Sequence, residues 1–159
     1  MSFELGGARY LSDSDRLAKE GAIVRVRLSS PRVAGAMSEL NAGYLTESRK
    51  ARALIDTGAS MDGIDLALAK MLKLRSFNTG EVHTASDTII APIFQVHLQI
   101  PQFRISGNIE MYGLKLSKVG LSYNVLLGRT FLRHFVMNYD GPNGRVDLVP
   151  KTQADAITP

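Results

Sequence analysis

The chain contains 159 residues, enough for one hydrophobic core and too few for two independent domains of ordinary size. Hydrophobic residues make up 45% and charged residues 21% without a long apolar run, which excludes a disordered chain and a helical membrane-spanning one. The lack of cysteine excludes disulfides and thiolate chemistry, and the net charge of +4 comes without a basic cluster of the kind that binds nucleic acid or lipid.

The N-terminal residues 1–20 are expected to form an arm, residues 21–150 a single domain, and residues 151–159 a flexible tail. Within the arm, Ser12 and Ser14 are candidate N-caps of a short helix that Gly21 would end. The first ten residues lack the apolar run of a secretory signal, so we expect a cytoplasmic location.

The first half of the domain is predicted to be mainly β. Residues 24–28 alternate apolar and basic side chains, the pattern of a strand with one solvated face, whereas residues 32–50 keep no period and predict a long loop or a hairpin arm. Residues 51–55 form an apolar strand that leads directly into Asp56-Thr57-Gly58. Asp65 is expected to cap a short helix over residues 66–72.

The second half predicts more strands than helices. The sequence indicates a projecting hairpin at 76–91 and a strand at 94–100 with His97 on its solvated face. Short strand pieces are expected at 103–105, 109–111 and 114–119, followed by a buried strand at 125–127. The chain is then expected to form a helix at 130–136, a turn at 139–144 and a last strand at 145–149. Gly107, Gly113 and Gly120 are expected to separate the short pieces.

The Asp56-Thr57-Gly58 turn is the main candidate for chemistry. It places a carboxylate where a buried strand stops, and the glycine permits a tight turn. Such a tripeptide also arises by chance as an ordinary turn. However, Leu126-Leu127 stands 72 residues after Leu54-Ile55 and is likewise followed by a glycine and a helical stretch, which favours a domain built from two related halves.

The segment Leu54-Ile55-Asp56-Thr57-Gly58-Ala59-Ser60 resembles the active-site signature of the retropepsin-like aspartic proteases. The segment Val125-Leu126-Leu127-Gly128-Arg129 is similar to the second motif of that family. The resemblance covers roughly residues 21–149. It implies an all-β, single-lobe acid-protease fold, a closed β-barrel or sandwich with one or two short helices. It also places the flap, the family's mobile hairpin, at residues 82–88, which contain no glycine.

The resemblance further implies an aspartic endopeptidase that needs no metal or other cofactor, with Asp56 as its catalytic residue. Because the chain has a single Asp-Thr-Gly, we expect a homodimer that places Asp56 of each copy at the axis, and no nucleic-acid or membrane partner. Thr57, Gly128 and Arg129 would support the site, with Asp62 as a candidate partner of Arg129. The residues expected to line the substrate groove are Gly58, Ala59, Thr84, Ala85, Ser86 and Leu126.

Other functions stay open from the sequence alone. The same fold could act as a peptide-binding or dimerisation module without turnover. A monomeric β-barrel could bind nucleic acid through Arg25, Arg27 and Arg32. A serine hydrolase is disfavoured, because the residues around Ser60 do not form the G-x-S-x-G pattern. His83, within the predicted flap, could tune binding with pH, although a plain surface position is the simpler interpretation.

Overall fold

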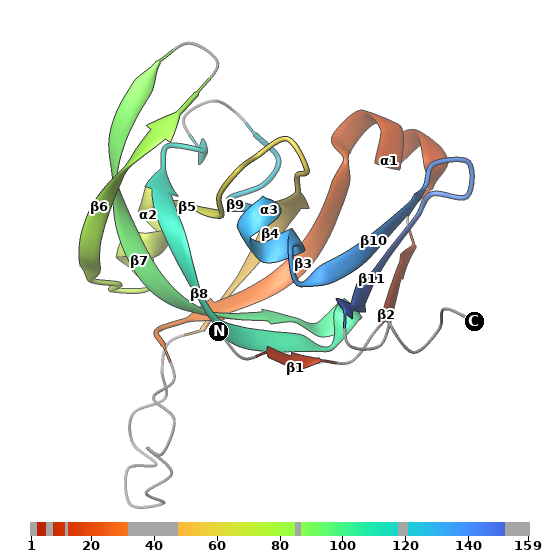
Figure 1. The fold of residues 1–159 in the computed structure, drawn as a ribbon, viewed down its shortest axis with the longest axis horizontal. Helices are drawn as coiled ribbons and strands as arrows, with labels where there is room; N and C mark the ends of the chain where they lie inside the picture. The colour runs from red at the N-terminus through yellow and green to blue at the C-terminus, as the bar shows by residue number, and fades with distance from the viewer. Residues whose placement is uncertain are drawn as a thin grey trace, which may run out of the picture.

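The computed structural model describes residues 3–5, 8–11, 13–31, 48–84, 87–117 and 121–151. In this part of the chain, six strands close into a barrel in the order β8-β5-β9-β4-β3-β7 and back to β8 (Figure 1). Their bounds are β3 (Ala22–Ser29), β4 (Arg49–Ile55), β5 (Gly63–Asp65), β7 (Thr88–Ile100), β8 (Ile105–Leu114) and β9 (Val125–Leu127). The β4–β9 and β5–β8 pairs are parallel, and the other pairs are antiparallel.

Further elements extend or cover this barrel. β1 (Phe3–Leu5) pairs with β8, and β6 (Ser76–His83) pairs with β7 as a hairpin that projects from the body. A second sheet has the order β10 (Phe135–Asp140), β11 (Arg145–Pro150) and β2 (Ala8–Leu11). The helices are α1 (Ser14–Glu20), α2 (Leu66–Met71), α3 (Arg129–Leu132) and the 3-10 turn η2 (Pro101–Phe103). Among the described residues, no helix is both long and apolar enough to span a membrane.

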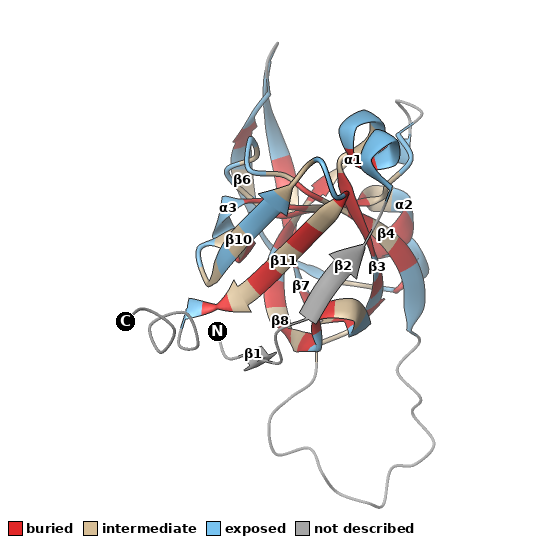
Figure 2. Ribbon diagram, turned by 90° about the vertical axis from the view of Figure 1, so that its right-hand side faces the viewer, coloured by how far each residue is buried: buried red, intermediate tan, exposed pale blue. Residues whose placement is uncertain are grey.

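The core lies inside the barrel and follows from the period-2 pattern of its strands. β8 alternates buried positions with half-buried or exposed ones along its whole length, and the bands of β11 in Figure 2 show buried positions alternating with half-buried ones. The largest fully buried side chains include Phe103, Phe131, Leu98 and Met111. The predicted all-β, closed-barrel fold class is therefore confirmed.

Several predicted elements need correction. The short strand pieces around residues 103–119 are largely one strand, β8, because Gly107 and Gly113 permit close packing instead of ending it. Gly107 lies between Phe3 and Leu98 in the sheet register, and a side chain at Gly113 would collide with neighbouring side chains. The N-cap of α1 is Asp13, whose carboxylate accepts a hydrogen bond from the amide of Arg16.

The region after α3 also differs from its prediction. The helix expected at residues 130–136 ends at Leu132, and Phe135 begins β10, which pairs with β11 over six residues. His97, expected on a solvated face, is only 7% exposed and contacts Asn108 and Ser106 on β8 through its two ring nitrogens. Cross-strand hydrogen bonds thus allow a polar side chain to be buried. Of the segment 32–50, predicted as a loop or hairpin arm, residues 32–47 lie outside the described residues, as does the tail from residue 152. Arg49 and Lys50 contradict that prediction, because β4 begins at Arg49.

Candidate active site

The two motifs found in the sequence lie side by side. β4 and β9 run parallel, with Leu54 opposite Leu126 and Ile55 opposite Leu127. The amide of Asp56 continues this pairing by donating to the carbonyl of Leu127 at 2.9 Å. The two motifs, 72 residues apart in the sequence, are therefore paired residue by residue in the sheet. Asp56 lies where the paired strands end.

Asp56 is held in a tight turn and remains half-exposed. Its Oδ1 accepts a hydrogen bond from the amide of Gly58 at 2.8 Å, and its carbonyl accepts from Ala59 at 3.3 Å. Within the described part of the chain, the other carboxylate oxygen makes no hydrogen bond. The turn thus fixes the carboxylate while leaving one oxygen available to a water, a substrate or a second carboxyl group.

Arg129 fastens this turn to the second motif. Its Nη1 donates to the carbonyls of Thr57 and Gly58 at 2.9 and 3.0 Å, and its amide donates to the carbonyl of Ala59 at 2.9 Å. The proposed partnership between Arg129 and Asp62 is wrong. The arginine donates to backbone carbonyls of the turn instead, and Asp62 accepts hydrogen bonds from other residues.

Asp62 is a buried carboxylate that the sequence assigned to the wrong partner. It is 3% exposed, and it accepts hydrogen bonds from the amide of Gly128 at 2.7 Å and from the hydroxyl of Thr130 at 2.9 Å. Burial raises its pKa to about 6, and the hydrogen bonds from Gly128, Thr130 and Phe131 oppose that rise. The hydroxyl of Thr130, two residues beyond the glycine, is the sequence signal that points to this contact.

Gly128 leaves no room for a side chain. A Cβ atom at this position would overlap the carbonyl groups of Met61 and Ala59, which are backbone atoms with little freedom to move. The glycine therefore permits the second motif to lie directly against the turn. We refer to this unit, residues 56–62 packed on residues 127–130, as the catalytic floor.

Asp65 anchors the far end of the floor. Its carboxylate caps α2 through the amide of Ala67 and also accepts from the amide of Ser117, at 2.9 and 2.7 Å. Burial alone would raise its pKa, but hydrogen bonds from Ser117, Ala67 and Leu68 outweigh that effect and lower it. The predicted capping role is confirmed, and the same side chain fixes the segment that leads toward β9.

The β6–β7 hairpin stands apart from the floor and carries the predicted flap (Figure 1). Thr84 is exposed near the tip, where its hydroxyl and amide both donate to the carbonyl of Asp87 and its hydroxyl accepts from the amide of Asp87. His83 contacts the hydroxyl of Thr88 through Nδ1 at 2.8 Å. Ala85 and Ser86, also predicted to line the groove, lie outside the described residues.

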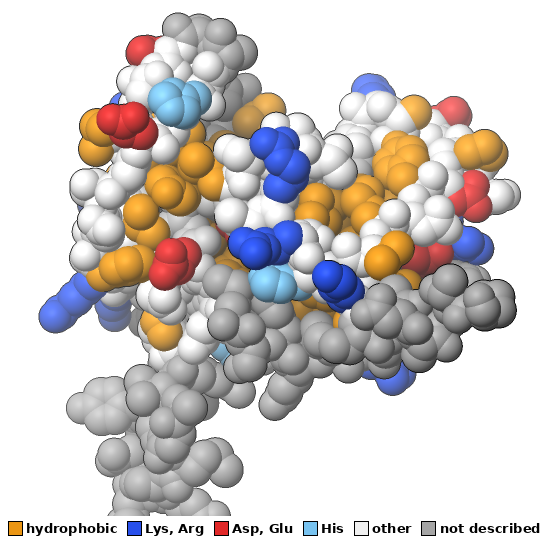
Figure 3. Space-filling view, in the orientation of Figure 1, with side chains coloured by type: hydrophobic (Ala, Val, Ile, Leu, Met, Phe, Trp, Pro, Cys, Tyr) orange, Lys and Arg blue, Asp and Glu red, His pale blue; other side chains and the backbone are white. Residues whose placement is uncertain are grey.

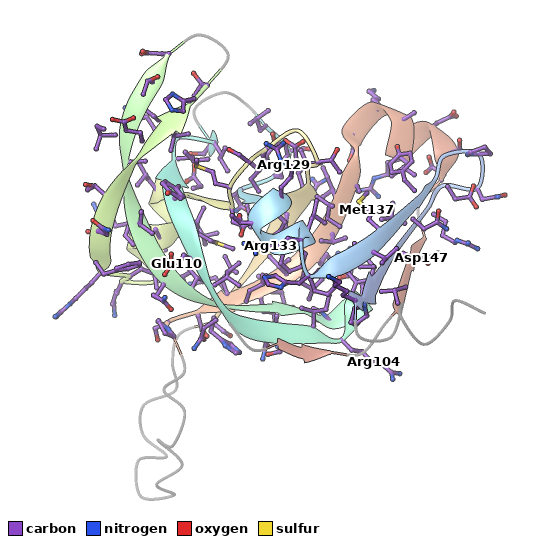
Figure 4. All side chains as sticks on the ribbon, in the orientation of Figure 1. Arg104, Glu110, Arg129, Arg133, Met137 and Asp147 are labelled. Atoms are coloured by element: carbon purple, nitrogen blue, oxygen red, sulfur yellow. The ribbon has the colours of Figure 1, made fainter. Side chains whose placement is uncertain are left out.

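The structure thus brings most of the predicted site residues together. Thr57 and Gly58 are exposed, Ala59 and Leu126 are half-buried, and hydrogen bonds or strand pairing connect them to Gly128 and Arg129. Figure 4 shows Arg129 and Arg133 extending from the α3 region, and Figure 3 shows basic side chains at the centre of this face, with hydrophobic ones on both sides. Among the described residues, no three His, Asp or Glu side chains group as metal ligands.

Comparison with known proteins agrees with this geometry. The family model for "gag-polyprotein putative aspartyl protease" matches residues 45–134, which contain both motifs and the hairpin. The chain belongs to the retropepsin-like aspartic protease family. A search of curated proteins found no match.

Solved structures show the fold that this family shares. A retropepsin-like aspartic protease from Rickettsia conorii superposes with a TM-score of 0.51 at 18% identity, over 93% of this chain and 94% of that one. The protease of Simian Foamy Virus (mac) matches with a TM-score of 0.38 at 18% identity, over 53% of this chain and 81% of the viral one. The first likeness spans nearly the whole of both chains, so the retropepsin-like fold extends through the described domain.

Proposed function

We propose that this protein is an aspartic endopeptidase that hydrolyses peptide bonds with a water activated by two Asp56 carboxyl groups, one from each copy of a homodimer. The observation that carries the proposal is the half-exposed Asp56 carboxylate on a floor fixed by the second motif. Membership of an aspartic protease family supports it. No metal or covalent nucleophile is required by this chemistry.

Two carboxyl groups held together share one proton, because two negative charges at such short range repel each other. The ionised carboxylate takes a proton from the water as its oxygen attacks the peptide carbonyl carbon. The protonated carboxyl donates to the carbonyl oxygen and stabilises the negative charge that develops there. When the tetrahedral intermediate collapses, the C–N bond breaks, and the departing nitrogen takes the proton that the first carboxylate removed from the water. A hydroxyl of the intermediate returns a proton to the other carboxylate, which restores the singly protonated pair.

The second carboxyl group is expected from another copy, because the described chain offers no alternative near Asp56 with the same character. Asp62 and Asp65 are buried and already accept two hydrogen bonds each. Asp87 lies on the hairpin and Asp140 in the β10–β11 turn, where it accepts from Asn143. A symmetric dimer supplies the missing group by repeating Asp56 itself.

The substrate in this proposal is an extended polypeptide held between the floor and the β6–β7 hairpin, which acts as the flap. Gly58 and Ala59 offer backbone groups for strand-like pairing, and Leu126 offers an apolar contact. Thr84, Ala85 and Ser86 would cover the peptide from the hairpin. The exposed Thr57 hydroxyl is available to contact the second copy across the axis.

Cleavage of an unfolded protein at mildly acidic pH tests the proposal, with products identified by mass spectrometry. Asp56→Asn should reduce turnover by about 1,000-fold or more, since it removes the acid–base pair. Asp140→Asn, in a remote turn, is the matched control and should retain activity. Peptide binding without any turnover by the wild-type protein would instead support a binding module on the same fold.

Mixing the two proteins tests the shared site. Excess Asp56→Asn protein added to a fixed amount of wild type should suppress cleavage as mixed dimers form, whereas added Asp140→Asn protein should increase it. Sedimentation at the same concentrations should show a dimer. Cleavage unaffected by the Asp56→Asn protein, or activity from a strict monomer, would overturn the homodimeric mechanism.

A further inference from the structure

A cavity of about 800 Å³ lies against β3 and β4 of the barrel, and none of its lining residues belongs to the catalytic floor. Its walls are the outer face of β3 and β4, the η2 turn and the segment 121–124. The volume is in the range of cavities that hold a small ligand or a few side chains. Four basic residues line it, namely Arg25, Arg27, Lys50 and Arg52.

These four basic residues form two like-charged pairs. In the β3–β4 register, Arg25 is opposite Arg52, and Arg27 is opposite Lys50. Residues directly opposite each other project from the same face of a sheet, and two positive charges in that arrangement are destabilising. Figure 2 shows β3 and β4 side by side, with exposed and buried positions along them. The barrel therefore carries a compact block of positive charge at a cost to its own stability.

The chain compensates this charge only in part. Glu20 accepts from Arg52 at 3.2 Å, and it is shared with Arg16. In the described part of the chain, Arg25, Arg27 and Lys50 have no acidic side chain within ion-pair distance, and no Asp or Glu lines the cavity. Guanidinium groups in a recess attract carboxylates and bind them through two parallel hydrogen bonds.

The segment 121–124 connects the cavity to the catalytic floor, because it leads directly into β9, the strand that precedes Gly128. Asn124 lines the cavity and binds β4 through hydrogen bonds in both directions with the backbone of Arg52, each of 3.0 Å. Burial raises the pKa of the neighbouring Tyr123, and the negative charge of Asp56 raises it further. Along β4, Arg52 lies four residues before Asp56, roughly 13 Å in a strand.

We propose that this cavity is a subsite for acidic side chains of the polypeptide substrate, four to six residues from the cleaved bond. The inference rests on the proposed function. For a peptide that extends alongside β4, the spacing follows from the rise per residue of a strand, because Arg52 and Lys50 lie four and six residues before Asp56. The cavity also has apolar surface, contributed by Leu121, Tyr123 and Pro101. A recess with apolar and basic walls suits a peptide, whereas a nucleic-acid backbone binds along an open stripe of basic residues.

Cleavage of a peptide library tests the subsite. Wild-type protein should cleave preferentially where Asp or Glu stands four to six residues from the scissile bond on one side. The double variant Arg25→Gln/Arg27→Gln should lose this preference and cleave such peptides about tenfold more slowly, which corresponds to about 1.4 kcal/mol. Neutral peptides should be cleaved at the wild-type rate. The control Lys70→Gln/Arg75→Gln removes the same charge from exposed sites outside the cavity.

The outcomes separate the two proposals. Cleavage without an acidic preference, or a preference that the control variant also loses, overturns the subsite while leaving the endopeptidase intact. Absence of any cleavage overturns the proposed function. The thermal midpoint of Arg25→Gln/Arg27→Gln should equal or exceed that of wild type, because like-charge repulsion is relieved. A lowered midpoint would overturn the inference by showing that the arginines are structural.

A binding measurement identifies the ligand chemistry directly. Labelled hexaglutamate should bind the Asp56→Asn protein more tightly than hexaglutamine, with an affinity that falls as salt rises and with the Arg25→Gln/Arg27→Gln change. Preferential, arginine-dependent binding of a single-stranded RNA over hexaglutamate would replace the proposed peptide with nucleic acid. Equal affinity for hexaglutamate and hexaglutamine would also overturn the proposal.

Discussion

The catalytic floor and the β6–β7 hairpin are both required by the proposed mechanism, yet they are built in opposite ways. The floor is tied by Asp62 and Arg129 to strands in the barrel core, and Gly128 admits no added atom. On β6, Val82 is the single buried residue, and Ile90 on the facing strand is 66% exposed. The floor is thus fixed by packing, whereas the hairpin depends on pairing between its own strands.

This difference has a physical basis in their tasks. Acid–base chemistry needs carboxyl groups held to within a fraction of an ångström, which only a tightly packed support provides. A flap must admit a polypeptide and then cover it, and segments with few buried contacts open at low free-energy cost. Substitutions in the floor should therefore change stability and activity together, whereas substitutions in the hairpin should change activity alone.

The largest effect is expected from Gly128→Ala. The added methyl group meets the carbonyls of Met61 and Ala59, so the two motifs must separate, at a cost of about 3 kcal/mol of unfolding free energy. Thermal unfolding should show a midpoint roughly 10 °C lower, and cleavage should be lost. Gly141→Ala is the matched control, since its Cβ would lie 3.6 Å from the nearest atom, in Tyr139. Equal stability of both variants would contradict the tight contact.

Asp62→Asn should alter how stability depends on pH. The folded-state pKa of Asp62 is raised from 3.8 to about 6, so the folded protein binds the proton more tightly than the unfolded chain does. This carboxyl therefore makes wild-type stability fall as pH rises from about 4 to 6, by on the order of 2 kcal/mol. Denaturant unfolding at pH 4 and 7 should show this fall relative to Asp62→Asn. Parallel pH profiles of the two proteins would refute the raised pKa.

Arg129→Gln should have an intermediate effect. It removes the charged donor shared by the carbonyls of Thr57 and Gly58 and should lower stability by about 1 kcal/mol, because the site is exposed. The loosened turn should reduce kcat/KM by about tenfold or more, since 1.4 kcal/mol of lost transition-state stabilisation is tenfold. Arg133→Gln, at the end of the same helix, is the control (Figure 4). A similar loss in both variants would show a general charge effect instead.

Thr84→Val should have the smallest effect on stability. Loss of the hydroxyl that bridges to Asp87 affects an exposed turn and should cost under about 0.5 kcal/mol. KM should rise a few-fold with kcat nearly unchanged, because the hairpin contributes to substrate binding. Thr79→Val, exposed on β6 of the same hairpin, is the control. A large fall in the thermal midpoint for Thr84→Val would show that the hairpin is as tightly integrated as the floor.

The sequence predicts correctly the elements that depend on residues close together in the chain. Strand alternation predicted the barrel strands, Asp65 was identified as a helix cap, and the repeated apolar pairs indicated two related motifs. Prediction from the sequence fails where a neighbour distant in sequence decides the outcome. The sequence predicts strand breaks at Gly107 and Gly113, because the strands that pair with Gly107 and the side chains that surround Gly113 lie elsewhere in the chain. It predicts a solvated His97, because the hydrogen-bond partners of this side chain lie on another strand.

The sequence by itself determined the class of fold and the turn that carries Asp56, because a buried strand followed by Asp-Thr-Gly restricts both backbone and polarity over a few residues. Only the tertiary structure decided that Asp62 binds Gly128 and Thr130, that Arg129 binds carbonyls of the turn, and that four basic side chains face one cavity. These contacts join residues far apart in the chain. Closure of the barrel brings these residues within hydrogen-bond distance of one another, and that proximity decides which donor binds which acceptor.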